Sequence, residues 1–172
     1  MAFFDIEGYS PVWLSGLETI RRAHGDRLRA LVGERLQRVH LTWFVEYAEW
    51  LPDAPVVVDF GAERLEITHG KFDELSLTWN TIDPYGRPAW DWGDPAEPSP
   101  LRWRQDVYPE LSALEGQVLQ DVELLQSVSP DMAEGMVALG FVFPRGRFTV
   151  FNALDENGIE FVEPDSSYRR HS

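Results

Sequence analysis

Residues 28–41, LRALVGERLQRVHL, return in altered form as residues 111–124, LSALEGQVLQDVEL. The offset is 83 residues (28 to 111), and no gap is needed over this stretch. Eight positions are identical in the two copies, and most of them are aliphatic: Leu28, Ala30, Leu31, Gly33, Leu36, Gln37, Val39 and Leu41. Farther along the chain, Phe60 matches Phe143 and Arg64 matches Arg147. Self-similarity at a fixed offset predicts two copies of one structural unit.

Each copy has the same succession of predicted elements. A short helical segment ends at Gly33 in the first copy and at Gly116 in the second, and glycine commonly follows the end of a helix. Alternating apolar and polar residues then predict about four short strands in each copy. The connections between them are too short for crossovers, so these strands are expected to be antiparallel. The predicted fold class is α+β, mainly antiparallel β, with two tandem pseudo-repeats and an N-terminal helix.

The expected segment boundaries follow from this repeat. Residues 1–25 are expected to form an arm and a helix that starts near Val12 and is broken at Gly25. The remaining segments share one compact domain: the first unit at 26–82, a Pro/Trp-rich connector at 83–108, the second unit at 109–163 and a polar tail at 164–172. The two units either pair edge to edge in one long sheet or face each other as a sandwich.

The connector combines many prolines with several aromatic residues. Five prolines lie between Asp83 and Pro100, and this density predicts that no regular element forms there. A flexible linker would not contain so many tryptophans. We therefore expect an ordered connector whose aromatic rings pack on the sheet, or a recognition loop.

The formal net charge of −14 disfavours nucleic acid and anionic membranes as partners and attracts basic proteins, although it also serves solubility. The chain has no cysteine, so disulfides and thiolate chemistry are excluded. Residues 1–10 lack the features of a secretory signal, and no run of 18 apolar residues is present. We expect a cytoplasmic protein with no cofactor and leave its oligomeric state open.

Aromatic residues set among carboxylates give the main candidate site. Such a surface suits a basic partner, because the rings supply contact area and cation–π faces while the carboxylates pair with Arg and Lys. The alternative is that these rings fill the space between two sheets. The candidate residues are Trp43, Glu46, Tyr47, Glu49, Trp50, Tyr85, Trp90, Asp91 and Trp92.

Two acidic turns give an alternative site. Asp73 and Glu74 in the first copy correspond to Asp155 and Glu156 in the second. If the two turns face each other, their carboxylates could hold a divalent cation or act as a general acid and base. Acidic residues also suit turns for local reasons, because they bind their own backbone. The sequence contains no GxSxG, P-loop, GxGxxG or HExxH motif to support a specific enzyme class.

The chain resembles the small acidic immunity proteins of bacterial polymorphic toxin systems. The resemblance rests on short length, strong negative charge, lack of cysteine, the pattern LxxLxGxxLxxV and the segment FNALDENGIEF at residues 151–161. It covers the repeated regions and implies an inhibitor that binds and blocks a basic toxin or enzyme. Two alternatives stay open: a metal-binding protein or enzyme that uses the acidic turns, and a structural component that self-associates through a sheet edge.

Overall fold

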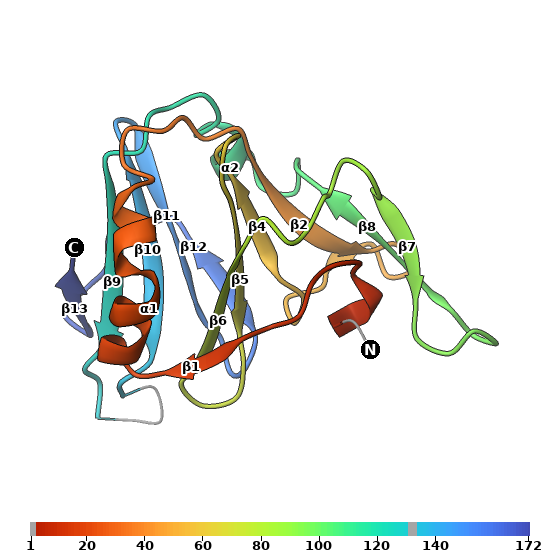
Figure 1. The fold of residues 1–172 in the computed structure, drawn as a ribbon, viewed down its shortest axis with the longest axis horizontal. Coiled ribbons are helices and arrows are strands. Elements are labelled where there is room, and N and C mark those ends of the chain that lie inside the picture. Colours follow the sequence, from red (N-terminus) through yellow and green to blue (C-terminus); the bar gives the residue numbers. More distant parts are fainter. Residues whose placement is uncertain (1–2, 131–133) are drawn as a thin grey trace.

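The computed structural model describes residues 3–130 and 134–172, and over these residues the chain is mainly antiparallel β (Figure 1). The helical elements are η1 (Phe3–Asp5), α1 (Leu17–Arg29) and α2 (Pro109–Ser112). The strands of the first half and the connector are β1 (Trp13–Ser15), β2 (Arg38–Phe44), β3 (Glu49–Trp50), β4 (Val56–Asp59), β5 (Arg64–His69), β6 (Glu74–Trp79), β7 (Ala89–Trp92) and β8 (Ser99–Arg104). The strands of the second half are β9 (Asp121–Ser127), β10 (Val137–Phe143), β11 (Gly146–Asn152), β12 (Asn157–Glu160) and β13 (Tyr168–His171).

The strands form two antiparallel sheets. The first has the order β1-β6-β5-β4-β2-β8-β7, with β3 paired to β2, and the second has the order β12-β11-β10-β9-β13. Within them, the meander β2-β4-β5-β6 and the meander β9-β10-β11-β12 have the same order of neighbours. These strands are rich in β-branched and aromatic residues, which fit a pleated and partly buried surface.

The sheets face each other and share one apolar core. Val58 and Ile67 from the first sheet belong to the same buried cluster as Leu139 and Phe148 from the second. Of the two arrangements considered from the sequence, the structure therefore has the sandwich. Alternation along each strand places every second side chain in this core and the others on an outer face.

The helices close the open sides of the sandwich, and each contacts the sheet of the other half. Helix α1 contacts β9 as well as β1 of its own half, and α2, which precedes β9 in the chain, contacts β2. Beside α2, the ring of Tyr108 meets the rings of Trp50 and Phe161 edge-on at 6.1 and 5.9 Å. The two halves are consequently interlocked.

The two copies of the repeated stretch pair with each other directly. The backbone N–H of Leu36 donates to the carbonyl oxygen of Gln117 at 3.0 Å, and that of Leu119 donates to Glu34 at 2.8 Å. Arg35 and Val118 form an isolated antiparallel bridge between these bonds. Residues far apart in the sequence therefore join the two sheets at one end of the sandwich.

A second, smaller core lies on the outer face of the first sheet. It contains Ile6 and Tyr9 from the N-terminal arm, together with Val57, Trp90 and Trp103. The arm is fixed by polar contacts as well: the hydroxyls of Tyr9 and Thr68 lie 2.5 Å apart. Residues 3–10 thus cover a sheet face that would otherwise be exposed.

The N-terminal helix differs from the sequence prediction. Gly25 was expected to end it, but α1 continues through Gly25 to Arg29, and residues 13–15 form strand β1 instead of its first turn. Glycine inside a helix costs about 1 kcal/mol relative to alanine. The burial of Ile20 and Leu28 on either side of Gly25 outweighs that cost.

The connector also differs from its prediction. It was expected to contain no regular element, but β7 and β8 form a hairpin that extends the first sheet past β2. Pro95 and Pro98 lie in the turn of this hairpin, while Pro88 precedes it. Only Pro100 lies within a strand, and the hairpin projects at the right of Figure 1, away from the second sheet. Residues 164–172, expected as a polar tail, contribute strand β13 beside β9.

Candidate functional site

The candidate aromatic residues are divided between the two faces of the β2–β8–β7 extension. Trp43 is opposite Trp50 on one side and Arg102 on the other, so the three side chains share one face. The guanidinium of Arg104 lies 4.2 Å from the ring centre of Trp43. Trp43 therefore lies among arginines, and its surroundings do not have the acidic character expected from the sequence.

Tyr47, Glu46 and Glu49 lie at or beside the turn between β2 and β3. Tyr47 is 62% exposed, and its ring lies 4.9 Å from the ring of Phe44 in an edge-on arrangement. Both glutamates are exposed. This turn has the combination of exposed ring and carboxylates that the sequence predicted.

Trp90 and Trp92 lie on the face of the hairpin that carries the smaller core. Trp90 is only 7% exposed, and its indole N–H donates to the carbonyl oxygen of Phe4 at 2.9 Å. Its ring lies 5.2 Å from that of Trp103, and the half-buried Trp92 lies 4.9 Å from Phe4. Trp90 is therefore not an exposed anchor. Asp91 is exposed, and alternation places it on the other face.

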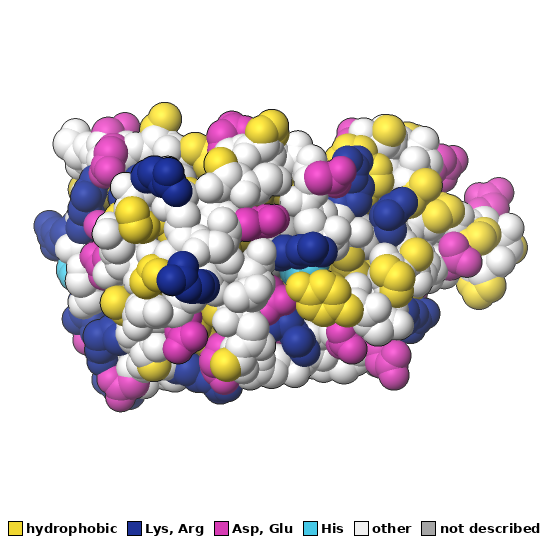
Figure 2. All heavy atoms as spheres, turned by 90° about the horizontal axis from the view of Figure 1, so that it is seen from above, with side chains coloured by type: hydrophobic (Ala, Val, Ile, Leu, Met, Phe, Trp, Pro, Cys, Tyr) yellow, Lys and Arg dark blue, Asp and Glu magenta, His cyan; other side chains and the backbone are white. Residues whose placement is uncertain are grey.

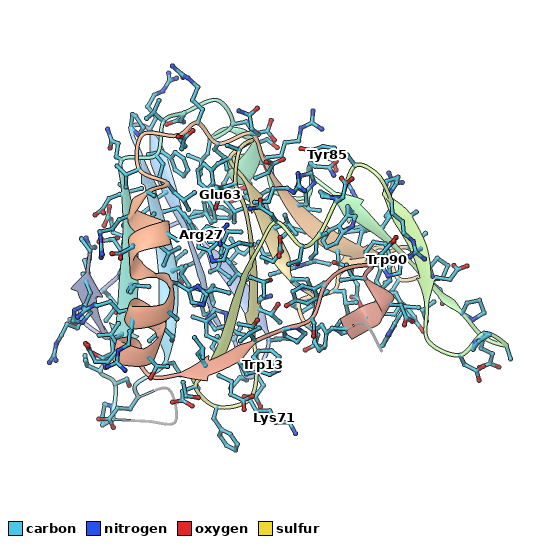
Figure 3. All side chains as sticks on the ribbon, viewed as in Figure 1. Trp13, Arg27, Glu63, Lys71, Tyr85 and Trp90 are labelled. Carbon is cyan, nitrogen blue, oxygen red and sulfur yellow. The ribbon has the colours of Figure 1, made fainter. Side chains whose placement is uncertain are left out.

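A cavity of about 380 Å³ opens between the N-terminal arm, the loop at 81–87 and the hairpin. We call it the outer pocket. Figure 3 shows Trp90 where the arm and the hairpin meet. Its lining combines tryptophan and isoleucine with charged residues and glycine. The lining residues are Asp5, Ile6, Glu7, Gly8, Thr81, Ile82, Asp83, Gly86, Arg87, Trp90 and Trp103.

The wall formed by residues 81–83 is fixed by buried groups of the first sheet. The Glu66 carboxylate, which is fully buried, accepts hydrogen bonds from the hydroxyl of Thr81 at 2.5 Å and from that of Thr78 at 2.8 Å. The side-chain Nε of Arg64 donates to the carbonyl oxygen of Ile82 at 3.0 Å. This wall is therefore held by charge-assisted hydrogen bonds, which are stronger than neutral ones.

Gly8 allows the arm to approach the loop at 81–87. A Cβ atom on Gly8 would lie 2.6 Å from the carbonyl oxygen of Thr81, and φ of Gly8 is +82°. Gly86 serves its own loop instead, because a Cβ there would lie 2.6 Å from a carboxylate oxygen of Asp83. A larger residue at Gly8 would push the arm outward, whereas one at Gly86 would displace the Asp83 side chain.

The charges around the outer pocket are mostly negative. Asp5, Glu7 and Asp83 contribute carboxylates, and Arg87 contributes the cation among the lining residues. Hydrogen bonds from the backbone N–H groups of Gly86 and Tyr85 hold the pKa of Asp83 below its usual value, so Asp83 is ionised at neutral pH. Arg87 approaches Glu7 at 4.0 Å, and both side chains are exposed, which makes this ion pair weak.

A buried histidine lies under the loop beside the pocket. Tyr85 donates its hydroxyl to Asp59 Oδ2 at 2.7 Å, and its ring lies edge-on to that of His40 at 5.1 Å. His40 is fully buried, and burial lowers its pKa to about 4. Its Nδ1 lies 2.9 Å from the amide nitrogen of Gln105, which can only donate, so Nε2 carries the hydrogen. Neutral His40 is thus part of the support that holds Tyr85 on the sheet.

The two acidic turns lie side by side, as considered from the sequence. The backbone N–H of Phe72 donates to Asp155 Oδ1 at 2.9 Å, and the amide of Asn152 donates to the carbonyl oxygen of Phe72 at 2.9 Å. Burial, followed by the nearby charge of Asp53, raises the pKa of Glu156. Within residues 3–130 and 134–172, no group of three or more His, Asp or Glu side chains is placed to hold a metal ion. Asp73 and Glu74 lie half-buried in the first turn.

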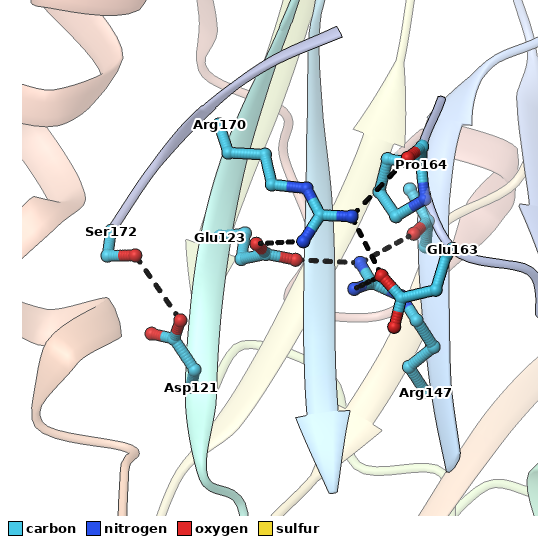
Figure 4. A network of polar contacts seen from close by, with 8 residues as sticks. Asp121, Glu123, Arg147, Glu163, Pro164, Arg170 and Ser172 are labelled. Carbon is cyan, nitrogen blue, oxygen red and sulfur yellow. Dashed lines mark hydrogen bonds and ion pairs between the residues drawn. The ribbon is translucent and has the colours of Figure 1, made fainter. Parts of the chain in front are cut away.

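The charges on the outer face of the second sheet are largely paired with each other (Figure 4). Arg147 and Glu123, both nearly buried, lie 2.8 Å apart, and Arg147 also approaches Glu163 at 3.4 Å. Arg170 of β13 contacts Glu163 at 2.7 Å and Glu123 at 3.5 Å. This network fixes the C-terminal strand, so we assign it a structural role.

Comparison of the chain with protein-family models, with curated proteins and with solved structures finds no match. In the part of the chain that the structure describes, no helix is long and apolar enough to cross a membrane.

Proposed function

We propose that the chain is a cytoplasmic protein-binding module that recognises a basic partner and acts as an immunity-type inhibitor. The observation that carries the proposal is the outer pocket, which combines two tryptophans with three carboxylates and one arginine. Aromatic rings and carboxylates together attract guanidinium and ammonium groups. A basic toxin or enzyme would be bound and blocked at this face.

The surroundings of the outer pocket supply further contact area. Tyr85, beside the pocket, is 52% exposed, and Tyr47 lies at the neighbouring turn of the same sheet extension. Hydrophobic and acidic side chains occur together at the far right of Figure 2, the end formed by the β7–β8 hairpin in Figure 1. Exposed aromatic residues are enriched at protein interfaces. We leave Trp43 out of the proposed interface because Arg102 and Arg104 surround it.

The net charge of −14 also supports the proposal, because it would raise the rate at which the chain associates with a basic protein. Long-range attraction raises the association rate of oppositely charged proteins, and added salt screens it. The affinity for a basic partner should therefore fall as the salt concentration rises, mainly through slower association.

We also infer that the two halves arose from one duplicated unit. The matched stretches at 28–41 and 111–124, the shared strand order and the paired backbone contacts between the stretches support this inference. On this basis the outer pocket was added to the first copy, because it is formed largely by the N-terminal arm and the connector, which lie outside the two repeated units. The second copy serves as a scaffold.

Binding to the basic product of a neighbouring gene tests the proposed function. The purified chain is expected to bind that protein at low salt, to abolish its toxicity or enzymatic activity, and to bind less tightly at high salt. Calorimetry at several salt concentrations and an activity assay measure these effects. If basic proteins neither bind nor lose activity, or if the affinity is insensitive to salt, the proposal is wrong.

One observation favours a second candidate function, self-association. Phe72 and Leu154 are 70% and 93% exposed at the tips of the two adjoining turns. Two apolar side chains held together at a surface suit contact with another protein, including a second copy of this chain. Light scattering over a hundredfold concentration range, with Leu154→Ser as the comparison, distinguishes a dimer from a monomer. A constant monomer mass removes this candidate.

A further inference from the structure

One arginine of the chain is stacked on a tryptophan ring and bonded to a carboxylate. The guanidinium of Arg27 lies 4.6 Å from the ring centre of Trp79, and its Nε donates to the Glu63 carboxylate at 2.8 Å. Figure 3 shows Arg27 and Glu63 next to each other between α1 and the first sheet. A ring face and a carboxylate edge together satisfy the flat, weakly hydrated guanidinium.

The outer pocket offers the same chemical groups, and no arginine of the described residues is stacked on its tryptophans. Trp90 and Trp103 line it together with Asp5 and Glu7 of the arm and Asp83 of the loop at 81–87. Within the described residues, the arginine–tryptophan stacks are those of Arg27 and Arg104, and neither involves these two rings. The nearest cation, Arg87, is half-exposed and approaches only Glu7.

We propose that the outer pocket binds one arginine side chain of the partner, with the guanidinium at the carboxylates of the arm and the loop and its aliphatic part against the tryptophans. This assignment rests on the proposed function and names the group of the partner that the site recognises. Arginine fits better than lysine because its planar group can stack on a ring and donate hydrogen bonds to two carboxylate oxygens at once. Glu66 and Arg64 hold the loop side of the pocket, and the contact of Tyr9 with Thr68 holds the arm, so little ordering is needed on binding.

A titration of the intact protein with three short peptides tests the assignment. The peptides are identical except for one central residue, which is arginine, lysine or citrulline, the uncharged analogue of arginine. Chemical shifts of the indole N–H groups of Trp90 and Trp103 report occupation of the pocket. We expect saturable shifts with the arginine peptide, weaker binding of the lysine peptide and no binding of the citrulline peptide.

Variants of the carboxylates locate the binding. Asp83→Asn keeps the oxygen that accepts from the N–H groups of Tyr85 and Gly86, so the loop should keep its shape. Asp83→Asn and Glu7→Gln are each expected to weaken arginine binding about tenfold, as expected for loss of one charge-assisted contact. Glu18→Gln, an exposed change on α1, is the matched control and should leave the affinity unchanged.

The possible outcomes separate this assignment from the proposed function. No shift at Trp90 or Trp103 with any peptide, or equal shifts with arginine and citrulline, overturns the arginine site. If a basic protein partner binds but Asp83→Asn and Glu7→Gln do not weaken that binding, the partner uses another surface. If the arginine peptide binds in the pocket but basic proteins do not bind the chain, the pocket assignment stands and the proposed function fails.

Discussion

The backbone N–H of Gly33 donates to the carbonyl oxygen of Leu119 at 2.9 Å, and its counterpart Gly116 donates to Leu36 at 2.7 Å. Both glycines have positive φ angles, +95° and +82°. The donors of these two hydrogen bonds between the halves thus have a left-handed backbone conformation, which is unfavourable for residues with a side chain.

Replacing these glycines should therefore destabilise the whole domain. Gly33→Ala and Gly116→Ala are each expected to lower the free energy of unfolding by about 1–2 kcal/mol, because alanine is strained at positive φ. Urea denaturation followed by tryptophan fluorescence measures the change. Gly25→Ala, inside α1, is the control: alanine favours the helix, but its Cβ would lie 3.3 Å from Cγ of Arg21, so stability should change by less than about 1 kcal/mol. A loss of stability in the control but not at Gly33 or Gly116 would contradict this explanation.

The buried ion pair of the second sheet gives another prediction. Arg147→Met leaves the Glu123 carboxylate without its closest cation and should cost about 3 kcal/mol, whereas Arg147→Met combined with Glu123→Gln should recover much of that loss. Arg170→Met, which removes a partly exposed partner, should cost less than about 1 kcal/mol. Chemical denaturation of the three variants and the native protein completes the comparison. Equal costs for Arg147→Met and Arg170→Met would show that burial does not determine the effect.

His40 makes the protein sensitive to acid in a defined pH range. Burial lowers its pKa from 6.5 to about 4 in the folded state, so between these values the unfolded chain binds a proton that the folded chain does not. Stability should fall by about 1.4 kcal/mol per pH unit from pH 6.5 to 4, and this loss should level off below pH 4. Burial also lowers the pKa values of His24 and His69, which adds to the slope.

Denaturation curves at a series of pH values measure this dependence. His40→Gln keeps a side chain that can accept from Gln105 but cannot titrate. The variant should therefore show a shallower decline than the native protein between pH 6.5 and 4. Identical slopes in the two proteins would mean that His40 has the same pKa in the folded and unfolded states.

The adjoining acidic turns should respond to mutation but not to metal ions. Asp155→Ala removes the acceptor of the Phe72 N–H and should cost about 1 kcal/mol. Asp155→Asn keeps an acceptor oxygen and should cost less. Thermal melts with Ca²⁺, Mg²⁺, Mn²⁺ and Zn²⁺ are expected to show no stabilisation; a bound metal at a hundred times its dissociation constant would add about 2.7 kcal/mol. A rise in the melting temperature that Asp155→Asn removes would support the metal alternative instead.

The strand pattern could be predicted from the sequence because alternation and turn residues are local signals. About four short antiparallel strands were expected in each half, and the structure has β2, β4, β5 and β6 in the first meander and β9 to β12 in the second. Gly25 misled the prediction because its local cost of about 1 kcal/mol yields to the burial of several apolar side chains. The prolines of the connector misled it because most of them lie outside the two strands, where they do not interrupt pairing.

The candidate site could be predicted only in part. The sequence showed that rings and carboxylates occur together, but it did not show which face of a strand each occupies. Trp43 and Trp90 lie on opposite faces, and only Trp90 reaches the outer pocket. The walls of the pocket come from residues 5–8 and 81–87, which are distant in sequence. The contact of Tyr85 with Asp59 was missed for the same reason, since no local pattern relates a loop to a strand that precedes it by 26 residues.

The contact of α1 with β9 and of α2 with β2 has a consequence for how the domain unfolds. Each half covers apolar surface of the other, so neither half can open without exposing the core that it shares with its neighbour. The two halves should therefore unfold together in one cooperative transition.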